Sequence, residues 1–281
     1  MGTSGSYSGS GGKAGKDLRQ ELTDWLDQLP PNPPEEQPPD DSDPGQPPTQ
    51  PPSPTQLPPE IVQNILPFLR PRATGGGGSD GPGGAGGIGG AGAGERGSSG
   101  GRSGGGPRRS AAVSAGSAGR AAAAAYAYQT GNVAELERLG LRYDELRTLG
   151  DPLEVTSRIV AAACGPNEST IEDMEQRYVA AELAEWVFEQ GAEAVPTPEE
   201  IVRKTISLII VETLESETGD LLRNGQRPAW ATELAEGELR DAAEVLAQRA
   251  TLSVDGVSEA EFAAAIENGI ETLRQILGGA G

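Results

Sequence analysis

Large apolar side chains are sparse in the first part of the chain and dense in the second. Within residues 16–29 they recur at spacings of three and four, the period of an amphipathic helix, at Leu18, Leu22, Trp25, Leu26 and Leu29. The pair Pro30–Pro31 ends this helix, because proline lacks an N–H and clashes with the preceding turn. A second short apolar group lies between Ile61 and Leu69.

From residue 110 onward the pattern predicts helices and no strands. We expect an Ala-dominated helix and then three short ones, at 110–129, 132–139, 143–148 and 152–163. Three later helices begin with a capping box, in which a hydroxyl and a carboxylate three residues apart satisfy free N–H groups of the first turn. These pairs are Ser169 with Glu172, Thr197 with Glu200, and Ser258 with Glu261.

The apolar patterns of three helices indicate how they pack. The helix from Thr197 is apolar almost all round through 206–211, so we expect it to be the central, buried one. The helix from Ser258 and a further one over about 232–250 each have a single apolar stripe. The fold class predicted is all-α, an irregular helical bundle in the C-terminal part of the chain.

Composition separates the bundle from the chain before it. Fourteen of the thirty residues at 30–59 are Pro, and Gly dominates 75–106. Such segments bury too little apolar surface to offset the entropy of ordering them. We therefore expect a flexible tip (1–15), a short amphipathic helix (16–29), a disordered linker, Pro-rich and then Gly/Arg-rich (30–109), and an acidic helical domain (110–281).

The net charge of −20 is unevenly distributed. Residues 121–281 carry twelve basic and thirty acidic groups, whereas 70–120 carry seven Arg and only two acidic residues. A domain this acidic repels nucleic-acid phosphates and anionic lipid, so we expect basic protein partners, no direct nucleic-acid binding and no membrane association. The Arg/Gly tract has three interpretations: contact with nucleic acid, a clasp on the acidic domain, or solubility.

The chain has no histidine, so it offers no imidazole base and no imidazole metal ligand. Cys164 is the only cysteine, and we interpret it as a small packed side chain. The carboxylate pairs Glu182/Glu185 and Glu199/Glu200 are typical of solvated helix faces and first-turn charges. We therefore expect no enzymatic activity, no metal and no resident cofactor. No apolar run reaches membrane-spanning length and no secretory leader is recognisable, so we expect a cytoplasmic protein.

Two segments of the arm are candidates for binding. Trp25 lies on a helix that has no neighbouring core in the sequence, so Leu18, Leu22, Trp25 and Leu26 are predicted to form an exposed, partner-binding stripe. Trp186 and Trp230, in contrast, are predicted to be packing residues. At the tip, removal of Met1 would expose the Gly2 amine, which is substantially neutral and nucleophilic near pH 7. The run Met1–Ser6 also fits a myristoylation pattern.

Several segments together resemble the QatB family, a component of the bacterial Qat anti-phage defence system. They are Met1-Gly2-Thr3-Ser4, Trp25-Leu26-Asp27 before a Pro-rich spacer, a Gly-rich tract ending in Arg108-Arg109-Ser110, the block from Ala118-Gly119-Arg120 to Gly131, and Leu139-Gly140-Leu141 followed by Asp144-Glu145-Leu146. These motifs are compositional rather than catalytic.

The resemblance implies a partner and substrate of a QueC-like deazaguanine synthase, acting beside an ATPase and a TatD-like nuclease. It further implies a covalent deazapurine on Gly2, with Thr3 and Ser4 as the recognised tip, and it replaces the myristoylation hypothesis. The alternative hypothesis from the residues is an acidic helical adaptor, or nucleic-acid mimic, whose arm is only a solubilising tail.

Overall fold

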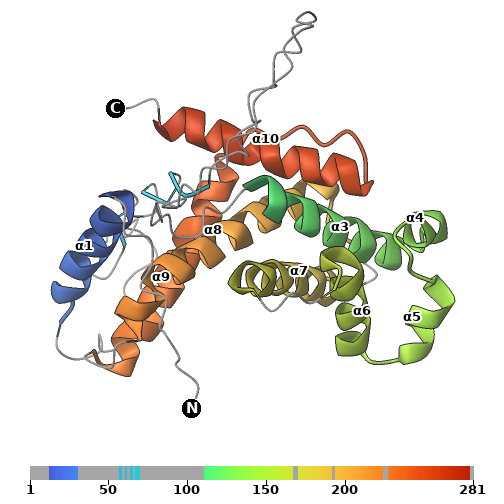
Figure 1. Ribbon diagram of the computed structural model, residues 1–281, viewed down its shortest axis with the longest axis horizontal. Helices are drawn as coiled ribbons and strands as arrows, with labels where there is room; N and C mark the ends of the chain where they lie inside the picture. Colours follow the sequence, from blue (N-terminus) through green and yellow to red (C-terminus); the bar gives the residue numbers. More distant parts are fainter. Residues whose placement is uncertain are drawn as a thin grey trace, which may run out of the picture.

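The computed structural model describes residues 13–30, 57–58, 61, 64–65, 67–69 and 111–278, except 167–169, 192–193 and 224–226. The described residues form an all-helical bundle and include no strand, as the sequence predicts (Figure 1). The helices are α1 (Lys13–Asp27), α3 (Ala111–Thr130), α4 (Val133–Arg138), α5 (Tyr143–Leu149), α6 (Pro152–Cys164), α7 (Ile171–Glu189), α8 (Pro198–Leu222), α9 (Ala229–Gln248) and α10 (Glu259–Gly278).

Helix α8 runs through the middle of the bundle, as its apolar pattern predicts (Figure 1). It contacts α7, α9, α10, α3 and α1, and its apolar side chains are buried along most of its length. The buried threonines Thr205, Thr213 and Thr218 each donate a hydrogen bond to the carbonyl four residues earlier. Because these hydroxyls are satisfied within the helix, they add no unpaired polar group to the core.

Helix α3 packs against α10, α7 and α6, and all of its alanines from Ala115 to Ala127 are buried. Short side chains allow neighbouring helices to approach closely. Helices α3 and α10 approach closely at Gly119, where a Cβ added to the glycine would lie 2.7 Å from the backbone nitrogen of Ala263 on α10. The α10 stripe predicted from the sequence faces this junction, with Phe262, Ile266 and Ile270 buried.

Two of the three predicted capping boxes are confirmed. At the start of α8, Glu200 accepts hydrogen bonds from the backbone nitrogen and hydroxyl of Thr197, and Ser258 with Glu261 forms the same arrangement before α10. The third prediction, Ser169 with Glu172, is wrong by one residue. Thr170 caps α7 instead, since its hydroxyl accepts a hydrogen bond from the nitrogen of Asp173.

The prediction of a structureless linker throughout 30–109 is also wrong. Leu57, Ile61, Ile65 and Leu69 are all at most 5% exposed and belong to the same core as the C-terminal helices. The backbone nitrogen of Leu57 donates a 2.9 Å hydrogen bond to the Glu238 carboxylate on α9. The apolar pattern identified this segment, but the surrounding prolines obscured that it has a place in the core.

Candidate functional site: the docked N-terminal helix

Gly2, Thr3 and Ser4 lie outside the described residues, which begin with α1 at Lys13. The predicted amphipathic helix at 16–29 is confirmed, with α1 extending one turn further toward the N-terminus than expected. Along the chain, α1 is therefore the described element that follows Gly2 most closely.

The apolar stripe of α1 is buried, so the prediction that it lies exposed is wrong. Leu18 and Leu22 are completely inaccessible, and Trp25 and Leu26 are at most 5% exposed. They join the common hydrophobic core, in which α1 packs against α8 (Figure 1). The stripe packs within the same chain, because it belongs to the hydrophobic core that also contains the apolar side chains of α8 and of Ile61, Ile65 and Leu69.

Polar contacts fix α1 along its middle and at its C-terminal end. The guanidinium of Arg19 donates a 3.3 Å hydrogen bond to the backbone carbonyl of Glu217 on α8 and lies 3.9 Å from its carboxylate. Asp27, at the end of α1, forms a 2.9 Å ion pair with Arg227, just before α9. Glu21 accepts a 2.6 Å hydrogen bond from the side-chain amide of Asn64.

The ion pair between Arg19 and Glu217 indicates that α1 is integral to the domain. Glu217 is only 3% exposed, and an ionised carboxylate taken out of water is costly unless a positive group accompanies it. Arg19 of α1 is such a group. Sequence reasoning missed this pair; the only signal was a lone Glu on the otherwise apolar face of the α8 pattern.

The indole nitrogen of Trp25 is buried and makes no hydrogen bond. An unsatisfied buried donor costs about 1–3 kcal/mol, which opposes the favourable burial of the ring. We therefore expect Trp25→Phe to change the free energy of unfolding by less than about 1 kcal/mol, because lost volume and the removed donor offset each other. Urea denaturation followed by circular dichroism measures this. If the free energy of unfolding fell by more than about 2 kcal/mol, this would contradict the finding that the indole N–H of Trp25 has no acceptor.

Docking of α1 limits the reach of the N-terminus. Gly2 precedes Lys13 by eleven residues, so it lies at most about 38 Å from the start of α1, whatever the conformation between them. If the fold began only at Ala111, as the predicted domain boundary implied, the corresponding limit would be about 380 Å. The structure therefore confines Gly2 to the neighbourhood of α1.

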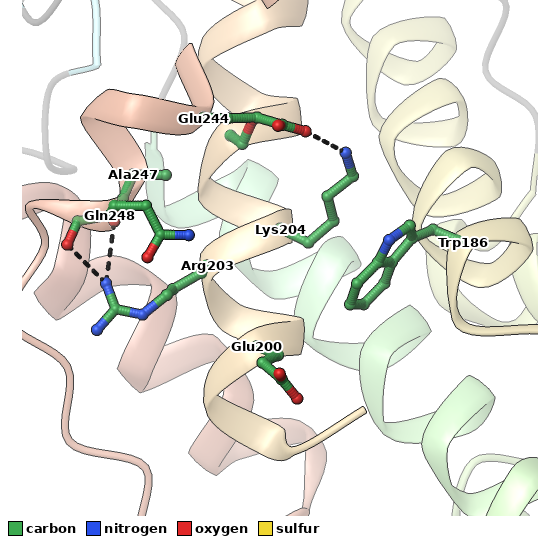
Figure 2. Close-up of a pocket in the computed structure, with 8 residues that line it drawn as sticks. Trp186, Glu200, Arg203, Lys204, Glu244, Ala247 and Gln248 are labelled. Carbon is green, nitrogen blue, oxygen red and sulfur yellow. Dashed lines mark hydrogen bonds and ion pairs between the residues drawn. The ribbon is translucent and has the colours of Figure 1, made fainter. Parts of the chain in front are cut away.

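A hollow of about 250 Å³ lies between α7, α8 and α9, and four of its lining side chains are charged: Glu200, Arg203, Lys204 and Glu244 (Figure 2). Arg203 donates hydrogen bonds to the carbonyls of Ala247, Gln248 and Ala250, at 2.9–3.3 Å, and so caps the end of α9. Its other terminal nitrogen contacts Glu199 at 2.7 Å. Such a guanidinium stabilises the negative end of the helix dipole.

The remaining charges in this hollow are also engaged. Lys204 on α8 forms a 2.7 Å ion pair with Glu244 on α9, beside the half-buried ring of Trp186 (Figure 2). Hydrogen bonds from the backbone and hydroxyl of Thr197 hold the pKa of Glu200 below its usual value. The carboxylate is thus an ionised helix cap, as the sequence predicted. The hollow is thus a junction between helices, in which each charged side chain is already bonded to a neighbouring group.

Other residues singled out from the sequence lie apart from this junction. Cys164 is half-buried at the end of α6, where burial raises the pKa of its thiol, in agreement with a small packed side chain. Trp230 is half-buried at the start of α9. Within the described part of the chain, no group of three or more His, Cys, Asp or Glu is placed to hold a metal ion.

The molecule is thus defined as an all-helical, acidic protein with its N-terminal helix docked into the core. Comparison of the chain with protein-family models, curated proteins and solved structures finds no match. Among the described helices, none is both long and apolar enough to cross a membrane.

Proposed function

We propose that this protein is a non-enzymatic subunit of an anti-phage defence complex that presents its N-terminal glycine to a QueC-like deazaguanine synthase. After Met1 is removed, the neutral Gly2 amine displaces the leaving group of a deazapurine that the synthase has activated and loses a proton, so that one N–C bond replaces the bond to the activating group. The resemblance of the tip and of Trp25-Leu26-Asp27 to the QatB family supports this assignment. The observation that carries it is the docking of α1 eleven residues after Gly2.

A short tether on a rigid anchor suits the delivery of an amine to an active site. A random coil of eleven residues would have a root-mean-square length of about 19 Å, so a synthase bound beside α1 would meet the amine at high effective concentration. The first ten residues after Met1 include only one bulky side chain, Tyr7. A chain of small residues can enter a narrow active site, and the neutral fraction of an α-amine at cellular pH makes it nucleophilic.

The acidity of the helical domain supports a role in binding other proteins and not in binding nucleic acid. The net charge of −18 over residues 121–281 favours basic protein surfaces, of the synthase or of the ATPase and TatD-like nuclease proposed as further partners. The rival function, an acidic adaptor with a purely solubilising arm, predicts that deletion of residues 2–12 leaves defence intact. Our proposal predicts that the same deletion abolishes it.

Co-expression with the synthase followed by intact-mass analysis tests the proposal. We expect the wild-type chain to gain the mass of one deazapurine adduct, located on Gly2 by fragmentation of the N-terminal peptide. Gly2→Leu should remain unmodified, because methionine aminopeptidase does not remove Met1 before a bulky residue and the amine at position 2 is then not exposed. Gly5→Ala is the matched control and should be modified like the wild type. An unmodified wild-type chain, or an adduct on another residue, would refute the assignment.

A further inference from the structure

A second surface, remote from α1, is a groove between α6 and α7 with a volume of about 510 Å³. Three of the most exposed large apolar side chains among the described residues line it: Leu153 is 66%, Met174 is 64% and Tyr178 is 42% exposed. The others, Val133, Val245 and Ile276, lie on three different helices. Scattered apolar residues are normal on surfaces, whereas a clustered group in a groove marks an interaction site.

The groove has the dimensions of a helix-binding site. Its lining residues run from Leu153 to Ala161 on α6 and from Met174 to Ala181 on α7, which at 1.5 Å per residue is about 10–12 Å on each wall. Two turns of a partner helix, with apolar residues at i, i+3 or i+4, and i+7, span the same length.

A hydroxyl in the α6 wall lacks a hydrogen-bond partner. Thr156 is 4% exposed, and its Oγ1 makes no hydrogen bond, unlike the buried threonines of α8. Unsatisfied buried polar groups are uncommon in native folds. Because this oxygen is itself buried, a partner in the groove does not reach it, and the groove wall at Thr156 offers no exposed hydroxyl.

The charges beside the groove determine the character of the partner. Arg177 is engaged by Asp173 at 3.0 Å and by the carbonyl of Gly165 at 2.6 Å, so its charge is already compensated. Helix α7 carries six acidic residues and one Arg, a net charge of −5. Burial, and then the negative charges of Glu182 and the α8 carboxylates, raise the pKa of Tyr178 at the groove edge. The surroundings of the apolar floor are therefore acidic.

We propose that the α6–α7 groove binds an amphipathic helix of a partner protein, with an apolar stripe that covers Leu153, Met174 and Tyr178 and a flank of Lys or Arg that faces the acidic side of α7. A second copy of this chain is a poor occupant, because its helices carry the same negative charge. The proposal is independent of the modification of Gly2.

Peptide binding to the full-length protein tests the proposal. The probe is a fluorescein-labelled synthetic helix of about 18 residues with a Leu stripe and Lys flanks, and its counterpart has Glu in place of Lys. Fluorescence anisotropy should show that the Lys peptide binds the wild type and the Glu peptide does not. Leu153→Glu and Met174→Glu should each weaken binding by about tenfold or more.

Val245→Glu and Ile276→Glu are matched controls, since they place the same charge on an equally exposed apolar position outside the groove. Each should change affinity by less than about twofold. Circular dichroism and an unchanged urea midpoint verify that every variant is folded. Failure of the Lys peptide to bind, equal binding of the Glu peptide, or equal effects of groove and control variants would overturn the proposal.

Discussion

Replacing Gly119 by alanine should destabilise the protein, although alanine is the better helix former. The new methyl group would lie 2.7 Å from the nitrogen and 2.9 Å from the Cα of Ala263. Backbone atoms cannot rotate away as a flexible side chain can, so α3 and α10 must separate at the most extensive helix–helix contact in the bundle. We expect the free energy of unfolding to fall by about 1–3 kcal/mol in urea denaturation.

Gly116 provides the matched control. It lies one turn earlier on α3, and a Cβ there would meet no atom within 4 Å. Gly116→Ala should therefore stabilise the protein by about 0.5–1 kcal/mol through helix propensity alone. Changes of opposite sign in the free energy of unfolding, for the same substitution at positions three residues apart, would establish the close approach of α3 and α10. Stabilisation by both substitutions would contradict it.

Truncation of Leu22 should detach α1. The side chain is completely buried between α1 and the core, so Leu22→Ala should cost about 2–5 kcal/mol of the free energy that holds the helix in place. Loss of docking also separates Arg19 from the buried carboxylate of Glu217. We expect trypsin to cleave the variant faster after Lys16 and Arg19, as followed by intact mass.

Gln20→Ala is the control for this experiment. Gln20 is on the exposed face of the same helix and hydrogen-bonds only to Asp24, also exposed. Cleavage of this variant at Lys16 and Arg19 should match the wild type within about twofold. Equal cleavage of the Leu22 and Gln20 variants would show that α1 does not depend on its buried face.

Detachment should also affect the proposed function. With α1 released, the length of chain between Gly2 and the next anchored residue increases, and the effective concentration of the amine at a bound synthase falls. The Leu22 variant should then be modified more slowly than the Gln20 variant. Because both retain Gly2, this difference measures the anchor rather than the acceptor.

Local sequence signals were sufficient to predict the individual helices. Spacings of three and four located α1 and α10, glycines separated the short helices, and the Thr197 and Ser258 capping boxes fixed two helix starts. The α7 cap was predicted one residue too early, because Ser169 and Thr170 are adjacent hydroxyl residues. Such ambiguity between neighbouring caps is inherent in sequence patterns, since either hydroxyl can accept a first-turn hydrogen bond.

Long-range packing was not predictable in the same way. The stripe on α1 was identified, yet its partner lies about two hundred residues later, on α8. Average composition placed Leu57, Ile61 and Ile65 in a linker, although each contributes to the core. The clustering of Leu153, Met174 and Tyr178 likewise depends on how α6 packs on α7. Periodicity predicts which face is apolar, but it does not say what covers that face.

Helix α1 belongs to the folded domain, so that only the residues before Lys13 separate Gly2 from a fixed point. Amide hydrogen exchange in the full-length chain tests this most directly. We predict that the amides of α1 are protected and that denaturant exposes them in the same transition as those of α8. Exchange of α1 at the rate of a free peptide, while α8 remains protected, would contradict it.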